Sequence, residues 1–81
     1  MSKYFVYILE CRDKTLYTGI ATNIERRVLE HNESSKGAKY TKVRRPVKLV
    51  YSKIFKDRST ASREEMRIKK FSRQEKLLLI K

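Results

Sequence analysis

The sequence predicts an α/β domain of the α+β type, with a three-stranded, mainly antiparallel sheet flanked by helices in the order ββαβαα. Two aromatic and β-branched runs, residues 4–9 and 16–20, are separated by a short polar turn, which is typical of a hairpin. A third, loosely alternating run spans residues 47–55. Capping patterns follow the second and third runs, so helices are expected after each of them. Because the chain has no internal repeat or low-complexity linker, a sheet covered by helices is the economical fold.

The helices are predicted from their caps and apolar spacing. Thr22 with Glu25 forms a capping-box pattern that opens a helix through about residue 33. Residues 38–45 are basic and expected to be irregular, ending at a proline. Cap residues at 57–60 precede a helix over about 61–71, and a second capping box, Ser72 with Glu75, opens a short final helix.

The chain's size and composition exclude several classes of protein. Its 81 residues predict a single domain, 1–81, whose core is too thin for a large cofactor pocket, so no small-molecule cofactor is expected. No apolar run is long enough for a membrane span and no signal peptide is evident, which favours a cytoplasmic protein. One cysteine and one histidine exclude an internal disulfide, a thiolate zinc cluster and multi-histidine metal sites. Metal chemistry would therefore have to use oxygen ligands.

Positive charge is concentrated in the second half of the chain. The net charge is +12, and residues 41–81 carry 14 Lys and Arg against 4 acids, which is 14 − 4 = +10. A segment with such an excess of positive charge repels itself in the folded state. The usual reason for this composition is a polyanionic partner, which neutralises the charge on binding. Nucleic acid is the first expectation. Solubility alone, or an anionic membrane surface, are weaker readings because acids serve solubility better and no bulky apolar face opposes the cations.

Glu65 interrupts an apolar stripe on the predicted helix over 61–71. Ala61, Glu65 and Ile68 are spaced to share one face of that helix. A carboxylate buried there must meet a cation, a metal or a hydrogen-bond donor. A structural salt bridge is the plain alternative to a metal. Glu64 lies about 100° further round the helix and is the weaker candidate.

Four further residues could carry chemistry. Arg27 and His31 are neighbours on the first helix, where a solvated helix face is the plain alternative. Tyr7 and Tyr17 lie on the two hairpin strands, where each could simply be a core or cross-strand aromatic.

Taken in order, these residues resemble the GIY-YIG nuclease domain. The resemblance covers nearly the whole chain and looks like the small stand-alone bacterial branch of that superfamily. It departs from the family pattern at Phe5, which replaces a glycine, at Thr18, which replaces an aliphatic residue, and in having no asparagine after Glu65. The motifs that carry it are Phe5-Val6-Tyr7, Tyr17-Thr18-Gly19, the run 23–32, Gly37-Ala38-Lys39-Tyr40-Thr41, Arg45-Pro46-Val47, and Glu65 followed by 68–70 and 72–76.

The resemblance implies a metal-dependent endonuclease that hydrolyses DNA phosphodiester bonds, in repair or recombination. It places one divalent ion, Mg²⁺ or Mn²⁺, on Glu65, and catalytic roles on Tyr7, Tyr17, Arg27 and His31. Mg²⁺ prefers carboxylate and water oxygens, so one glutamate leaves coordination positions for phosphate and water. Which tyrosine acts as the general base stays open at this point.

DNA contact is expected from a basic loop and from cations near the metal-binding glutamate. Such side chains mainly position the nucleic-acid backbone, so binding should be weakly sequence-specific or structure-directed. A monomer is expected, with any finer specificity supplied by a protein partner. The rival reading is a non-catalytic nucleic-acid-binding module, for DNA or RNA, that keeps the fold. Tyr40 could stack on a base or sugar, or it could anchor its loop by packing on the third strand. The residues are Lys39, Tyr40, Lys42, Arg44, Arg45, Lys69, Lys70 and Arg73.

Overall fold

The three predicted strands form one antiparallel sheet. A computed structural model describes residues 3–34 and 36–80. The strands are β1 (Tyr4–Glu10), β2 (Leu16–Ala21) and β3 (Lys48–Phe55), in the order β2-β1-β3. Both neighbours of β1 run antiparallel to it, so the first strand is the centre of the sheet. The predicted fold class is confirmed.

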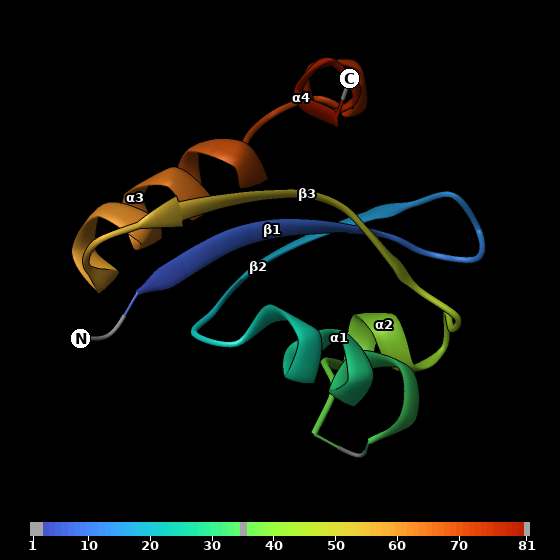
Figure 1. Cartoon of the computed structure of the whole chain (residues 1–81). Coiled ribbons are helices and arrows are strands. Elements are labelled where there is room, and N and C mark those ends of the chain that lie inside the picture. The colour runs from blue at the N-terminus through green and yellow to red at the C-terminus, as the bar shows by residue number, and fades with distance from the viewer. Residues whose placement is uncertain (1–2, 35, 81) are drawn as a thin grey trace.

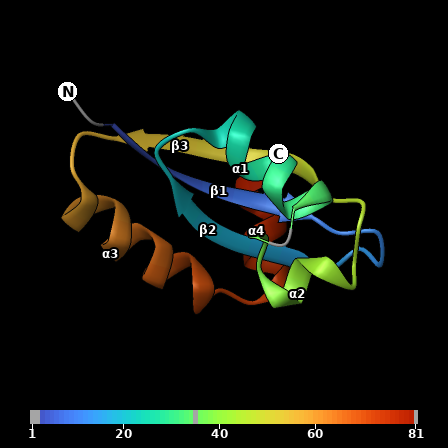
Figure 2. The same cartoon turned by 90° about the horizontal axis from the view of Figure 1, so that it is seen from below.

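The helices lie on both faces of the sheet. They are α1 (Ile24–Glu33), α2 (Lys39–Lys42), α3 (Arg58–Lys69) and α4 (Arg73–Ile80). Figure 1 shows α1 and α2 on one side of the sheet and α4 on the other. Figure 2, seen from below, shows α1 and α2 in front of the sheet and α3 running along β2. In the described part of the chain, no helix is long and apolar enough to cross a membrane.

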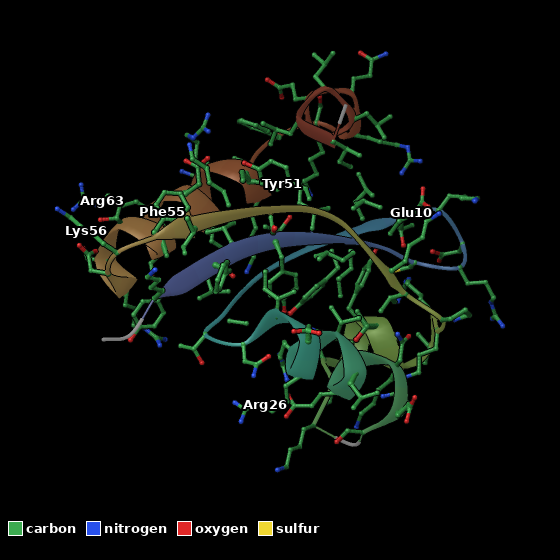
Figure 3. The ribbon with its side chains drawn as sticks, viewed as in Figure 1. Glu10, Arg26, Tyr51, Phe55, Lys56 and Arg63 are labelled. Atoms are coloured by element: carbon green, nitrogen blue, oxygen red, sulfur yellow. The ribbon has the colours of Figure 1, made fainter. Side chains whose placement is uncertain are left out.

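The alternation of β1 divides the core into two clusters. Val6 and Ile8 pack on the α3 and α4 side, with Ala61 and Ile68 of α3. Tyr51 and Phe55 of β3 lie on this same side, as Figure 3 shows. Tyr7 and Leu9 point the opposite way, with Cys11, Val47 and the apolar stripe of α1. Successive side chains of a strand point to opposite faces, so Tyr7 belongs to the α1 side.

The helix starts confirm two caps and correct a third. Asp57 caps α3 by accepting from the backbone N–H of Thr60. The capping box of α4 is formed in both directions, with Ser72 N–H donating to Glu75 and Glu75 N–H donating to the Ser72 hydroxyl. The expected Thr22 cap of α1 is wrong by one residue, because Asn23 caps it by accepting from Arg26 N–H.

The segment 38–45 is not wholly irregular. It contains the single helical turn α2, in which the Ala38 carbonyl accepts from the N–H groups of Thr41 and Lys42. This turn has few apolar residues and only four residues in all, so propensity and periodicity give it no signal. Its packing against α1 is what orders it.

Candidate active site

Tyr7 lies directly opposite a glycine on the neighbouring strand. In the β1–β2 pairing its partner is Gly19. A Cβ at residue 19 would fall 2.5 Å from the phenol oxygen and 2.7 Å from the ring Cζ, which is closer than real Cβ atoms approach. The tyrosine of the first triplet therefore requires the glycine of the second. Tyr7 is 1% exposed and its ring forms part of the α1-side core.

His31 joins Tyr7 to α2 by hydrogen bonds at both ring nitrogens. It lies near the end of α1 and is fully buried. Its Nε2 is 2.9 Å from the Tyr7 hydroxyl, and its Nδ1 is 2.8 Å from the Thr41 hydroxyl. Three elements that are separate in sequence therefore meet at one imidazole. The alternative interpretation of a solvated helix face therefore does not hold for His31, which is buried.

Burial sets the protonation of this pair. Burial, together with the charge of Arg27, lowers the pKa of His31 to about 4. Burial also raises the pKa of Tyr7 to about 12, assisted by Tyr17 and opposed by Arg27. At neutral pH the free protein thus holds a neutral imidazole against a neutral phenol.

Arg27 is held beside the Tyr7 hydroxyl. Its Nη1 donates to Glu30 Oε1 at 2.9 Å and to the Lys36 carbonyl at 3.0 Å. Its positive charge lowers the pKa of Tyr7, which places the guanidinium within electrostatic reach of the phenol. The preceding residue, Arg26, points away from the sheet (Figure 3), and its side chain is 69% exposed. The two adjacent arginines therefore form a matched pair, one inside the site and one outside.

Tyr17 contacts His31 and continues into a stack of side chains. Its ring lies edge-on to the imidazole, with ring centres 5.1 Å apart, and is stacked on Tyr40 at 5.9 Å. The Arg44 guanidinium lies 3.9 Å from the centre of the Tyr40 ring and pairs with Asp13 at 3.2 Å. The Tyr40 ring is thus engaged within the protein, which matches the loop-anchor alternative. Its partner is Tyr17 of β2 rather than the third strand.

Glu65 and Glu64 face different parts of the molecule. Glu65 Oε2 is 3.2 Å from Lys69 Nζ, and its negative charge raises the pKa of Tyr7. Glu64 binds the Arg67 guanidinium through both carboxylate oxygens, and its charge raises the pKa of Tyr51 on the other side of the sheet. Of the two, it is Glu65 whose field reaches the site around Tyr7.

The donors present suit a hard divalent cation held by few protein ligands. The Glu65 side chain keeps 21% of its surface exposed, so its oxygens can reach an ion from solvent. Over residues 3–34 and 36–80, no group of three or more His, Cys, Asp or Glu side chains comes together. A single carboxylate completed by water and phosphate oxygens is a typical environment for Mg²⁺.

Several of the cations expected to bind nucleic acid have partners inside the protein. The Arg45 guanidinium donates to the carbonyls of Glu30, His31 and Ser34 and so caps the end of α1. Arg73 donates to the Lys14 carbonyl at 2.6 Å. Arg44 and Lys69 are paired as described above. Exposed cations remain at Lys39, Lys42 and Lys70.

Thr41 is a site residue that the sequence did not single out. It is fully buried and holds His31 Nδ1. Gly37 permits this arrangement, since a Cβ there would fall 2.8 Å from the Glu30 carbonyl oxygen and 2.9 Å from His31 Cα. The run 37–41 contributes to the family resemblance as a motif, but nothing in its composition points to a contact ten residues back along the chain.

Comparison with known proteins decides the family. The model of the GIY-YIG catalytic domain matches residues 3–77. The chain belongs to the GIY-YIG family. This is a nuclease-type family, so membership implies contact with nucleic acid. The predicted resemblance is confirmed.

The chain is similar over nearly its whole length to several small bacterial proteins. A UPF0213 protein of Syntrophus aciditrophicus is 60% identical over 81 residues, covering 100% of this chain and 93% of that protein. One from Staphylococcus haemolyticus is 56% identical over 80 residues, covering 99% and 96%. The solution structure of a UPF0213 protein from Bacillus halodurans has a TM-score of 0.62 at 44% identity, covering 96% of this chain and 82% of that one. A structure from E. faecalis has a TM-score of 0.65 at 40% identity, covering 94% and 80%.

Proposed function

We propose that this protein is a metal-dependent endonuclease that hydrolyses DNA phosphodiester bonds, with weak sequence preference or a preference for DNA structure, in repair or recombination. The observation that carries the proposal is the 2.9 Å hydrogen bond between Tyr7 and the neutral, buried His31. A phenol alone is a poor base at neutral pH, but a phenol backed by an unprotonated imidazole can pass a proton on.

Tyr7 is the tyrosine that we assign as the general base. The attacking water gives its proton to the Tyr7 oxygen while the phenol proton moves to His31 Nε2. Concerted transfer is required, because a free tyrosinate next to an imidazolium is strongly unfavourable for groups with pKa values of about 12 and about 4. The phenol is almost fully buried in the free protein, so this mechanism requires that binding of nucleic acid opens a path for the water to Tyr7.

Arg27 and Tyr17 then act on the phosphate. Arg27 is half-buried and oriented by Glu30 and the Lys36 carbonyl, so its charge is fixed before the substrate arrives. A preorganised guanidinium stabilises the charge that builds on the phosphoryl oxygens in the transition state. Tyr17, stacked between His31 and Tyr40, orients the phosphate or the water.

Glu65 is the residue that would hold the divalent ion. When bound, Mg²⁺ or Mn²⁺ polarises the phosphate and stabilises the departing oxyanion. In the free protein the Glu65 carboxylate is balanced by Lys69, which keeps the negative charge from standing alone near Tyr7.

The rival is a nucleic-acid-binding module that keeps this fold without cleaving. It draws on two observations: no asparagine follows Glu65, and the Glu65 carboxylate already has a partner in Lys69. The two readings differ in what Glu65 does, because binding by surface cations needs no carboxylate at that position.

The deciding experiment is a cleavage panel on plasmid, flap, fork and single-stranded DNA, with Mg²⁺ or Mn²⁺. We expect wild type to cleave at least one substrate, Glu65→Gln to abolish cleavage while binding persists, and Glu64→Gln to remain active. Glu64 is a matched control because it is the neighbouring carboxylate, similarly buried, and paired with its own cation. Failure of wild type to cut any substrate with either ion would leave the binding module.

A further inference from the structure

The Thr41 hydroxyl has a hydrogen-bonding pattern that restricts His31. It donates to the Ala38 carbonyl at 3.0 Å and lies 2.8 Å from His31 Nδ1. A hydroxyl group has a single proton to donate. With that proton on the Ala38 carbonyl, the Thr41 oxygen accepts at its contact with Nδ1. This arrangement favours the tautomer with the imidazole proton on Nδ1.

The consequence appears at the other ring nitrogen. A neutral imidazole has one N–H, so placing it on Nδ1 leaves a lone pair on Nε2. Nε2 is the atom that faces the Tyr7 hydroxyl, which then has to donate to it. In the opposite tautomer Nε2 would itself donate to the phenol oxygen and could accept nothing from it.

We propose that Thr41 is a positioning residue that fixes His31 in the Nδ1–H tautomer and so keeps Nε2 open as the acceptor for the Tyr7 proton. The catalytic meaning of this tautomer rests on the proposed nuclease function. The tautomer itself does not, because it follows from hydrogen bonds present in the free protein.

The surroundings make Thr41 a rigid acceptor. It is fully buried, and both its N–H and its hydroxyl donate to the Ala38 carbonyl, which closes the turn of α2. On the other side, Arg45 donates to the His31 carbonyl and holds the end of α1 in place. Neither the threonine nor the imidazole can turn away without leaving a buried polar group unpaired, which is costly.

The test is the tautomer of His31, measured by ¹⁵N NMR on the free protein at neutral pH. We expect a protonated nitrogen signal at Nδ1 and an unprotonated one at Nε2. Thr41→Val removes the acceptor but keeps the shape of the side chain. The ring should then move to the Nε2–H tautomer, because that form keeps a hydrogen bond to the Tyr7 oxygen and avoids a buried unpaired N–H. Thr41→Ser retains a hydroxyl and should retain the wild-type tautomer.

The second measurement is the nuclease activity of the same variants. On a substrate that the wild type cleaves, Thr41→Val should lower kcat about 100-fold or more, the usual contribution of a general base, with KM little changed. Thr41→Ser should restore most of kcat. A purely structural role for Thr41 would instead lower stability without changing which ring nitrogen is protonated.

The outcomes separate this proposal from the proposed function. An Nε2–H signal in wild type would overturn the role of Thr41 even if DNA is cleaved, and so would an unchanged tautomer in Thr41→Val. The expected tautomers without any cleavage would support the positioning role and count against the nuclease. If Thr41→Val does not fold, the wild-type and Thr41→Ser spectra remain as the test, and an Nε2–H signal in either would overturn the role of Thr41.

Discussion

The ring of Tyr7 and the backbone of Gly19 face each other across β1 and β2 so closely that no Cβ fits between them. The hydroxyl at the end of the same ring is held by His31. The absence of a side chain at Gly19 therefore sets the position of the phenol in the site. The pairing of β1 with β2 must keep Gly19 opposite Tyr7 for the hydroxyl to reach His31.

Gly19→Ala should therefore displace Tyr7. We expect a loss of about 1–3 kcal/mol in the free energy of unfolding, as for other overpacked cores, together with loss of the Tyr7–His31 hydrogen bond. Denaturant unfolding measures the first, and the His31 ¹⁵N signals report the second. In a Tyr7→Ala background the same change should cost little, because the ring that it meets is gone. Equal losses in both backgrounds would show that the ring is not the reason for the glycine.

The stability of the protein should fall on mild acidification because of His31. Its pKa is about 4 when folded against 6.5 when exposed, so between these values the unfolded chain binds the extra proton. The free energy of unfolding should thus drop by up to about 3 kcal/mol as pH falls from 6.5 to about 4.

The control for this titration is His31→Gln. The glutamine side chain neither gains nor loses a proton between the folded and unfolded pKa values of the histidine that it replaces. Urea unfolding of this variant should show a much flatter pH dependence there. Carboxylates with lowered pKa values, such as Glu30 and Asp57, lose their contribution at lower pH, below their unfolded values of 4.5 and 3.8. A slope that persists unchanged in His31→Gln would assign it to other groups.

Arg45 is expected to stabilise the fold rather than to bind DNA. Its guanidinium donates to three carbonyls at the end of α1, and charged hydrogen bonds of this kind are each worth about 1.5–3 kcal/mol. Arg45→Ala should lower the free energy of unfolding by about 2 kcal/mol or more. Arg26→Ala, with a 69% exposed side chain, should change it by less than about 0.5 kcal/mol.

The exposed lysines of α2 are expected to bind DNA rather than to stabilise the fold. Lys39→Ala and Lys42→Ala should each reduce the slope of log affinity against log salt by about one unit for duplex DNA, with little change in stability. Fluorescence anisotropy across a salt series measures the slope. Lys56→Ala is the control, since Lys56 lies at the end of the molecule away from α2 (Figure 3). Equal effects at all three lysines would indicate a diffuse charge effect with no localised contact.

Local patterns were enough to predict most of the fold. The strand runs, the Asp57 cap and the reciprocal Ser72–Glu75 box depend on neighbours in sequence, so they can be recognised without coordinates. The Thr22 cap was displaced to Asn23, a shift of one residue that competing cap residues readily allow. The single turn α2 gives no local signal in the sequence, because contacts with α1, rather than its own composition, order it.

Spacing in the sequence singled out two hairpin tyrosines, an arginine, a histidine and a helix glutamate as candidates, and the family resemblance implied catalytic roles for them. Only the folded chain decided how they are connected. Thr41 reaches His31 from ten residues away, Arg45 turns its charge onto the end of α1, and Tyr40 packs on Tyr17. These choices depend on which buried donors and acceptors need partners once the sheet and α1 have closed, and that requirement exists only in three dimensions.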